Sequence, residues 1–277
     1  MKKITEIIEL EKKADYIRKK LVDVSVKNGA GHIAPSLSCV DILTLLYYHV
    51  LSLNDDPKWE GRDRLVFSKA HGAYGLYSIL ADIGYLREED WNNFYKGSFL
   101  KGCIERSPKY GIEAGCGSLG HGMPMAVGIA FGAKIQNKKY QCYCIAGDGE
   151  TQEGSNWEAV QFAVKYKLNN LIIVVDCNGL QAMDSLDNVL SPVDSYQDLS
   201  VKFAAFGCEV MTCDGHNMAE LKNIFEKVSE LKGDAGPVVI LAKTVKGYGI
   251  KAMENVVKFH FRVPTKEELA MGVRYER

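Results

Sequence analysis

The chain has 277 residues, of which 47% are hydrophobic, and this is enough to form the core of one large α/β domain. Lys and Arg number 34 against 35 for Asp and Glu, so the formal net charge is -1, and neither nucleic acid nor an anionic membrane is expected as a partner. No stretch has the roughly 18 consecutive apolar residues that a membrane helix needs, and the charged amphipathic start is unlike a secretory signal.

The cysteines are mostly set in apolar runs. None of the eight belongs to a Cys-x-x-Cys pair, which would indicate a zinc site or a redox dithiol. Buried, reduced thiols are therefore expected, and they favour a cytoplasmic location.

Two helices are predicted at the start of the chain. Between Ile4 and Lys27, apolar residues recur at helical spacing, which indicates a long amphipathic helix. The segment from Ser38 to Leu51 is apolar nearly all round. Such a helix is buried or lies in an interface, so we consider it as a surface for self-association.

Strands and helices alternate over the rest of the chain. Strands are predicted at Leu65 to Phe67, Gln141 to Ala146, Leu171 to Asp176, Gly207 to Thr212 and Val238 to Ala242. Helices are predicted at Ala73 to Ile83, Met123 to Ile135, Ser155 to Tyr166, Gln197 to Phe206 and Met218 to Leu231. The alternation predicts a single α/β domain over residues 1–277, with a doubly wound, mostly parallel sheet covered by helices on both faces. Its ligand should lie at the carboxyl ends of the strands.

The most informative stretch is residues 143–180. One predicted strand ends before Gly147-Asp148-Gly149, and the next ends before Asn178. Because the carboxyl ends of parallel strands meet at one edge of the sheet, Asp148 and Asn178 should lie close together. Carboxylate and amide oxygens are suitable ligands for Mg²⁺ or Ca²⁺. The glycines allow close approach of a diphosphate, and the following helix directs its amide dipole toward it.

Several further motifs occur in an order that resembles the transketolase family. The resemblance covers nearly the whole chain and rests on segments 31–38 (GHIAPSLS), 67–72 (FSKAHG), 117–122 (GSLGHG), 147–158 (GDGETQEGSNWE), 214–216 (DGH) and 244–249 (TVKGYG), followed by residues 253–261.

The resemblance implies the diphosphate-type domain of the thiamine diphosphate-binding fold, with thiamine diphosphate and Mg²⁺ or Ca²⁺ as cofactors. The family activates its cofactor with a glutamate on a pyrimidine-binding domain, which is expected here on a second subunit. We therefore expect the diphosphate- and metal-binding subunit of a split transketolase, which transfers a two-carbon ketol unit from a ketose to an aldose. It should self-associate and form a heterotetramer with its partner.

The resemblance also assigns roles to individual residues. It implies that the metal is held by Asp148, Asn178 and the carbonyl oxygen of Leu180, and that catalysis involves His32, Glu158 and His260. His32 would handle a substrate hydroxyl, Leu119 would press on the thiazolium, and Glu153 and Glu158 would lie at the subunit contact. The expected cofactor-binding residues are His71, Ser118, Leu119, Gly120, Gly147, Asp148, Gly149, Glu153, Asn178, Leu180 and His260.

Three positions depart from the family's pattern. Cys103 stands where many transketolases have a histidine that recognises the ketose donor, Ala34-Pro35 replaces Gly-Gly, and Phe261 replaces the usual Gly after His260. All three are expected on the substrate side, so the sugar substrate is expected to be unusual.

Three other interpretations stay open. The first is a two-subunit thiamine enzyme that moves an unusual ketol or acyl unit. The second is the α subunit of a 2-oxo-acid dehydrogenase, which usually lacks the 67–72 and 117–122 segments. The third is a non-catalytic scaffold, although intact metal ligands argue against it.

Overall fold

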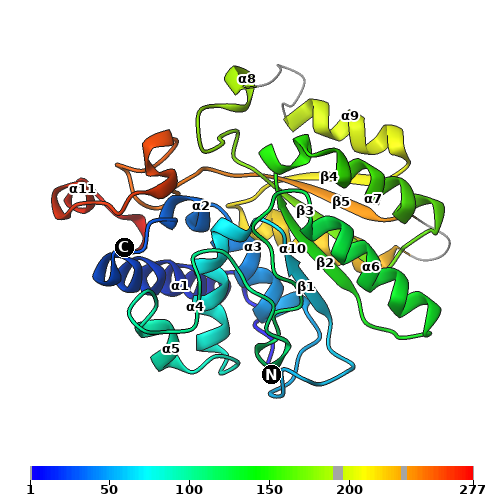
Figure 1. Cartoon of the computed structure of the whole chain (residues 1–277), viewed down its shortest axis with the longest axis horizontal. Helices are drawn as coiled ribbons and strands as arrows, with labels where there is room; N and C mark the ends of the chain where they lie inside the picture. The colour runs from blue at the N-terminus through cyan, green and yellow to red at the C-terminus, as the bar shows by residue number, and fades with distance from the viewer. Residues whose placement is uncertain (1, 190–195, 232–235, 277) are drawn as a thin grey trace.

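A five-stranded parallel sheet forms the centre of the molecule (Figure 1). The computed structural model describes residues 2–189, 196–231 and 236–276. The strand order is β1-β2-β3-β5-β4, and every neighbouring pair is parallel. The strands are β1 (Arg64–Phe67), β2 (Cys142–Gly147), β3 (Leu171–Cys177), β4 (Glu209–Asp214) and β5 (Val238–Lys243). The predicted parallel sheet is confirmed.

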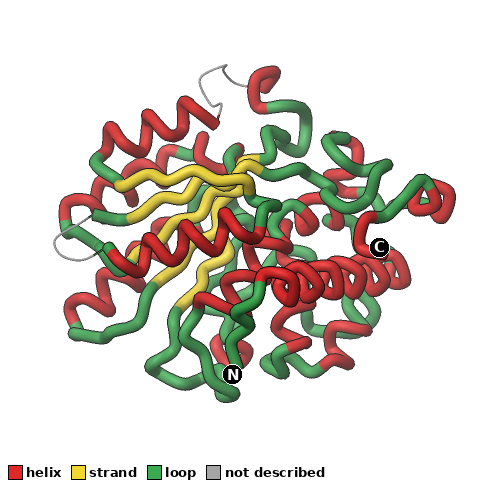
Figure 2. The backbone as a smooth tube through the Cα atoms, turned by 180° about the vertical axis from the view of Figure 1, so that it is seen from behind, coloured by secondary structure: helices red, strands yellow, loops and turns green. Residues whose placement is uncertain are grey.

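Helices cover both faces of this sheet (Figure 2). The longer ones are α1 (Ile7–Asn28), α4 (Ala73–Asp82), α6 (Gly122–Ile135), α7 (Gly154–Lys165), α9 (Tyr196–Phe206) and α10 (Met218–Glu230), and the shorter ones are α2 (Ile33–Leu37), α3 (Val40–Leu45), α5 (Glu88–Asn92), α8 (Leu186–Val189) and α11 (Lys266–Ala270). On one face α6 packs against β1, β2 and β3, α9 packs against β4 and β5, and α7 lies between α6 and α9. On the other face α10 packs against β4 and contacts α1 and α3. Among the described residues, no helix has the length and apolar character required to cross a membrane.

The two central strands are buried along their whole length. In β2 and β3 every residue is buried, because helices cover both faces of a parallel sheet. This explains why both strands are nearly continuous apolar runs without a polar face.

Helix α1 buries one face in the hydrophobic core. Its buried residues recur three or four positions apart and include Leu10, Ile17 and Leu21. The helix ends at Gly29, which has a left-handed φ of 73° and donates its N–H to the carbonyls of Ser25 and Val26. Glycine adopts this conformation without the steric cost that a side chain adds.

The apolar segment from Ser38 to Leu51 is not a contact surface. It forms α3 and then a π-helical turn, Leu46–Val50, and all of it is buried except three partly buried residues at 48–50. Helices α1, α4 and α10 cover it. The prediction that it mediates self-association is therefore wrong, because its apolar surface is already used inside the chain.

The register of the sheet explains why the loops that follow β2, β3 and β5 lie close together. Gly147 of β2 pairs with Asp176 of β3, and Asp176 pairs with Ala242 of β5. The loops after these strands consequently leave the sheet at one edge, as expected for a ligand site in this class of sheet.

Candidate functional site

A cavity of about 290 Å³ lies at the carboxyl ends of β1, β2, β3 and β5. Most of the predicted cofactor-binding residues line it, namely His71, Leu119, Gly147, Asp148, Gly149, Asn178, Leu180 and His260. It is also lined by Pro35, Lys69, Glu150, Gln181, Ala182, Met183 and Lys246. The structure therefore brings together loops that are far apart in the sequence.

Asp148 places a buried carboxylate on this cavity. Its side chain accepts the N–H of Gly149 at 2.7 Å and the N–H of Gly179 at 2.6 Å. Among the described residues, no Lys, Arg or His forms an ion pair with it. Burial and then the nearby Asp176 raise the pKa of Asp148 to about 6, although the backbone N–H groups and the charge of Lys69 act in the opposite direction.

The loop after β3 lines the same cavity with Asn178 and Leu180. Gly179 has a left-handed φ of 73°, and the turn lets Leu180 donate its N–H to the side-chain oxygen of Asn178 at 3.0 Å. No group of three or more His, Cys, Asp or Glu side chains suited to a metal occurs in the described part of the chain. A cation here would depend on one carboxylate together with amide and carbonyl oxygens, which are the ligands that Mg²⁺ and Ca²⁺ accept. The carboxylate of Asp148 is buried and has no ion-pair partner among the described residues, which fits such an ion.

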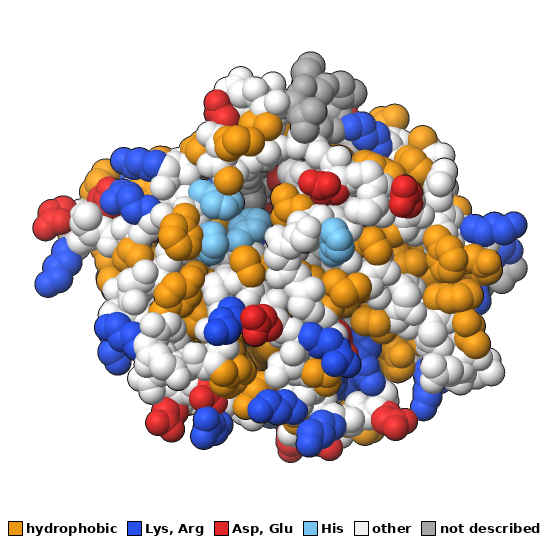
Figure 3. Space-filling model, in the orientation of Figure 1, with side chains coloured by type: hydrophobic (Ala, Val, Ile, Leu, Met, Phe, Trp, Pro, Cys, Tyr) orange, Lys and Arg blue, Asp and Glu red, His pale blue; other side chains and the backbone are white. Residues whose placement is uncertain are grey.

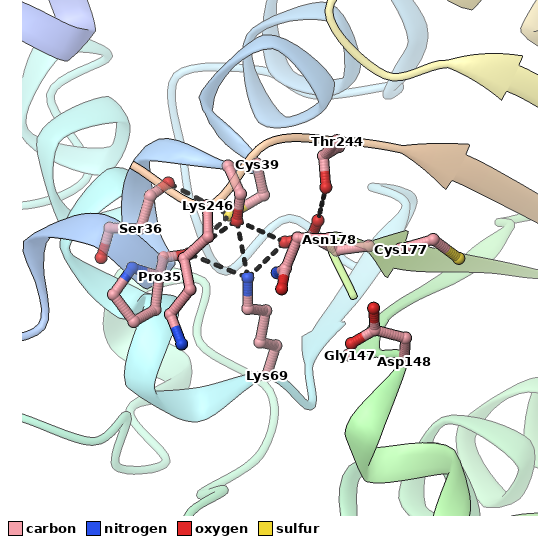
Figure 4. Close-up of polar contacts among 12 residues, drawn as sticks. Pro35, Ser36, Cys39, Lys69, Gly147, Asp148, Cys177, Asn178, Thr244 and Lys246 are labelled. Carbon is pink, nitrogen blue, oxygen red and sulfur yellow. Dashed lines mark hydrogen bonds and ion pairs between the residues drawn. The ribbon is translucent and has the colours of Figure 1, made fainter. Parts of the chain in front are cut away.

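A buried charge network lies next to the cavity, and Figure 4 shows the polar contacts around Lys69. Lys69 pairs with Asp176 and donates to the side chain of Ser38 at 2.7 Å and to the carbonyl of Pro35 at 2.9 Å. Thr244 also bonds to Asp176. Burial alone would raise the pKa of Asp176, but Lys69 and the hydroxyl donors hold it below its usual value. The network fixes the loops after β1, β3 and β5 relative to one another.

Lys246 is a second buried cation at the cavity, and the sequence interpretation gave it no role. Its ammonium group donates to the carbonyl of Gln181 at 2.8 Å and contacts Nδ1 of His260 at 3.0 Å. Burial and then Lys69 lower the pKa of Lys246 to about 8, so it remains largely protonated at neutral pH. The sequence could have indicated this position at the cavity, because Lys246 lies in segment 244–249, which directly follows a predicted strand.

Three histidines gather beside the cavity, and Figure 3 shows histidine side chains beside a hollow in the middle of one face. The ring centroids of His71 and His260 are 5.0 Å apart, and that of His32 lies 5.9 Å from His71 and 5.6 Å from His260. Burial lowers the pKa of His32 to about 4. Burial and then Lys246 lower the pKa of His260 to about 3. Because the ammonium group of Lys246 can only donate, Nδ1 of His260 accepts, which leaves the imidazole proton on Nε2.

His32 does not line the cavity itself. It is half-buried at its rim, and its Nδ1 is a buried atom without a hydrogen-bond partner among the described residues. An unpaired buried nitrogen is costly, and a ligand hydroxyl would satisfy it.

Glu150 organises the loop at 117–122 and was also missed. Its carboxylate accepts from Ser68 at 2.5 Å, from the N–H of Gly120 at 3.0 Å and from the N–H of Gly147 at 3.3 Å. It thereby ties the glycine-rich loop to the ends of β1 and β2. Leu119 lies on this loop with 40% of its surface exposed and faces the cavity.

Besides His32, the structure leaves four predicted residues outside the cavity lining, and one of them, Gly120, is buried in the loop at 117–122. Ser118, Glu153 and Glu158 are exposed, and none of them contributes to the cavity lining. Their predicted roles in cofactor binding, at a subunit contact and, for Glu158, in catalysis depend on a partner chain and stay predictions.

The unusual residues of the sequence lie near the histidines. Pro35 lines the cavity and is buried with Ala34, and its carbonyl is one of the acceptors for Lys69. Cys103 is half-buried, and burial raises the pKa of its thiol. Phe261 packs against His32, with ring centroids 4.6 Å apart.

Comparisons with known proteins agree with this geometry. Residues 10–272 match the family described as transketolase, thiamine diphosphate binding domain. The chain is 40% identical over 273 residues to one subunit of the apulose-4-phosphate transketolase from Actinobacillus succinogenes, covering 96% of this chain and 95% of the relative. It is 35% identical to a 6-deoxy-6-sulfo-D-fructose transketolase subunit from a Clostridium species, covering 94% and 93% of the two chains. The crystal structure of transketolase from Campylobacter jejuni superimposes with a TM-score of 0.84 at 32% identity, covering 95% of this chain but 42% of that one.

Proposed function

The chain belongs to the transketolase family of thiamine diphosphate-binding domains and is a transketolase-like transferase, and we propose that it is the diphosphate- and metal-binding subunit of a two-subunit enzyme. In this proposal residues 1–277 form one diphosphate-type domain, and a second subunit supplies the pyrimidine-binding domain. The observation that carries the proposal is the meeting of Asp148, Asn178 and Lys246 in one cavity at the strand ends.

The metal would be held by Asp148, Asn178 and the carbonyl oxygen of Leu180. A divalent cation there would compensate the buried carboxylate of Asp148 and leave positions for phosphate oxygens and water. Lys246 would supply a further positive charge to the diphosphate, and His71, Gly149 and His260 would contact it.

When bound, thiamine diphosphate supplies the nucleophilic thiazolium carbon that carries a two-carbon ketol unit between sugars. Leu119 would lie against the thiazolium, and Ser118, Gly120 and Gly147 would shape the backbone around the cofactor. His32 is neutral at pH 7 because burial lowers its pKa to about 4, so its imidazole could accept a proton from a substrate hydroxyl.

Two features support assembly with other chains. The relative that this chain matches over 95% of its length is named as a subunit. Glu153 and Glu158 are exposed acids next to the cofactor loops, and we propose that they contact a second copy in a heterotetramer. All eight cysteines are free thiols, which supports a cytoplasmic enzyme.

The substrate is proposed to be a specialised sugar or sugar phosphate. Two relatives are named for apulose 4-phosphate and for 6-deoxy-6-sulfo-D-fructose, and this chain departs from the family at Cys103 and Phe261. These facts favour an unusual ketose donor over the common ketose phosphates.

Calorimetric titration of thiamine diphosphate with Mg²⁺ tests the proposal, with the partner subunit present. Asp148→Asn keeps the shape of the side chain but removes its charge, and affinity should fall by an order of magnitude or more. The matched control is Asp23→Asn, which removes an exposed carboxylate on α1 and should leave affinity unchanged. Equal affinity in the wild type and Asp148→Asn would contradict the metal site.

A further inference from the structure

Phe261 is an exposed aromatic residue in an unusual position. It ends a 3-10 turn at Val257–Phe261, and 59% of its surface is accessible. Its ring nevertheless packs against His32 at 67° between the ring planes. An exposed ring held beside a half-buried imidazole can contact whatever approaches that imidazole.

The ring of Phe261 packs against the backbone at Gly31. A Cβ added to Gly31 would lie 2.9 Å from Cδ2 and 3.0 Å from Cε2 of Phe261, which is closer than such atoms approach. The absence of a side chain at position 31 therefore lets the ring sit directly on the backbone before His32. The position of the Phe261 ring therefore depends on glycine at position 31.

Rings surround His32, which also forms a hydrogen bond with the backbone of Gly102. Besides Phe261, its neighbours are His260 at 5.6 Å, His71 at 5.9 Å and Tyr74 at 6.1 Å between ring centroids. Its Nδ1 has no hydrogen-bond partner in the described part of the chain. Removing Phe261 would open one side of the imidazole to solvent and to substrate.

We propose that Phe261 is a specificity-determining residue that forms an apolar wall over His32 and selects ketol donors that are short or carry few hydroxyls on that side. This inference rests on the proposed function. A hydrocarbon ring offers no strong hydrogen bond to a hydroxyl that it desolvates, so a long polyhydroxylated donor loses more at this wall than a compact one. Where a glycine occupies this position, backbone and water would be accessible instead.

The main experiment compares two donors with the reconstituted enzyme and ribose 5-phosphate as acceptor. Hydroxypyruvate, a 2-oxo acid that releases carbon dioxide when it gives up its ketol unit, is the short donor, and fructose 6-phosphate, which releases an aldose phosphate, is the long one. Phe261→Ala should raise the ratio of kcat/KM for fructose 6-phosphate over hydroxypyruvate by about tenfold, the scale on which pocket shape discriminates between substrates. The control Met271→Ala shortens another apolar side chain, which is 58% exposed, and should change the ratio less than twofold.

A second variant tests the pairing with Gly31. Gly31→Ala should displace the ring and shift the donor ratio in the same direction as Phe261→Ala, and it should have no further effect when both changes are combined. Fully additive effects of the two changes would overturn the inference, because Gly31 would then act independently of the ring.

A second measurement, which does not need turnover, reports how accessible the imidazole of His32 is to a chemical reagent. Modification by diethyl pyrocarbonate, located by peptide mass spectrometry, should be several-fold faster at His32 in Phe261→Ala, with His49 as the internal reference. An unchanged donor ratio in an active Phe261→Ala enzyme would overturn the inference but leave the proposed function intact. Loss of assembly with the second subunit in this variant would also overturn it, since the ring would then be a subunit contact. A wild type that transfers a ketol unit from neither donor nor from any ketose would overturn the proposed function itself.

Discussion

A buried ion pair at Asp41 should contribute strongly to the stability of the fold around the cofactor segment. The guanidinium of Arg18 donates to both carboxylate oxygens of Asp41 at 2.9 and 2.8 Å, and both side chains are less than 10% exposed. Nδ1 of His216 lies 2.7 Å from the same carboxylate, and its Nε2 accepts the N–H of Val245 at 2.9 Å. The cluster thereby anchors the segment that carries Lys246.

Asp41→Asn tests this cluster. The amide keeps the shape of the side chain, but it leaves the buried guanidinium of Arg18 without its main counter-charge. Removing one partner of a buried pair costs about 3 to 5 kcal/mol. Because Arg18 keeps its second bond to Asp15 at 2.7 Å, we expect the lower end, about 3 kcal/mol of unfolding free energy. This is a large part of the roughly 5 to 15 kcal/mol that stabilises a typical domain.

Equilibrium unfolding in urea at pH 7 measures the effect. The matched control is Asp15→Asn, which removes the half-exposed partner of the same arginine and should cost less than about 1 kcal/mol. A loss of less than 1 kcal/mol for Asp41→Asn, or equal losses for both variants, would refute the reasoning.

The cluster also predicts a pH dependence. Burial alone would raise the pKa of Asp41, but Arg18 and then His216 hold it below its usual value. The stabilisation is therefore fully present above the unfolded pKa of about 3.9 and is lost as pH falls through the lower folded pKa. The difference between wild type and Asp41→Asn should be constant from pH 7 to about 5 and shrink only in stronger acid. A difference that already vanishes at pH 5 would contradict this sign.

Further predictions concern the cofactor, the donor and the assembly. Lys246→Met removes the buried cation at the cavity, so calorimetry should show thiamine diphosphate binding about tenfold weaker or worse, and equal affinity would exclude it from the diphosphate contacts. Cys103→His replaces a weak donor by a strong one, so kcat/KM of the reconstituted enzyme with xylulose 5-phosphate should rise by about 10- to 100-fold, whereas no gain would mean that Cys103 does not set this preference. Light scattering should show at least a dimer of the wild-type chain and weaker self-association of Glu158→Lys, and a wild-type monomer both alone and with the second subunit would contradict the proposed assembly.

The central strands could be predicted from the sequence because their burial on both faces leaves a local signature. The apolar runs at Cys142–Gly147 and Leu171–Cys177 needed no knowledge of the rest of the chain. The meeting of Asp148 and Asn178 followed in turn, since the carboxyl ends of neighbouring parallel strands share one edge.

The buried charge networks could not be predicted in the same way. Lys69 and Asp176 are separated by 107 positions, and nothing in either neighbourhood indicates that the partner is present. Glu150 is similar, since two of its three partners, Ser68 and Gly120, lie 82 and 30 positions away in the sequence. Such pairs depend on tertiary structure, and only the finished fold identifies which polar residues are buried together.

The segment from Ser38 to Leu51 shows a different limit. An all-round apolar helix is compatible with burial inside the chain or between chains, and its composition does not distinguish the two. In this fold the segment is buried inside the chain, because α1, α4 and α10 cover it.

Hydrogen-deuterium exchange at the thiazolium C2 of thiamine diphosphate most directly tests whether this chain binds the cofactor but needs a second subunit to activate it. With Mg²⁺ present, the wild-type chain should bind thiamine diphosphate and leave C2 exchange at its rate in free solution. Addition of the second subunit should accelerate the exchange, and Asp148→Asn should abolish that acceleration at a cofactor concentration that saturates the wild type. Fast exchange with this chain alone would contradict the account, because the activating group would then lie within these 277 residues.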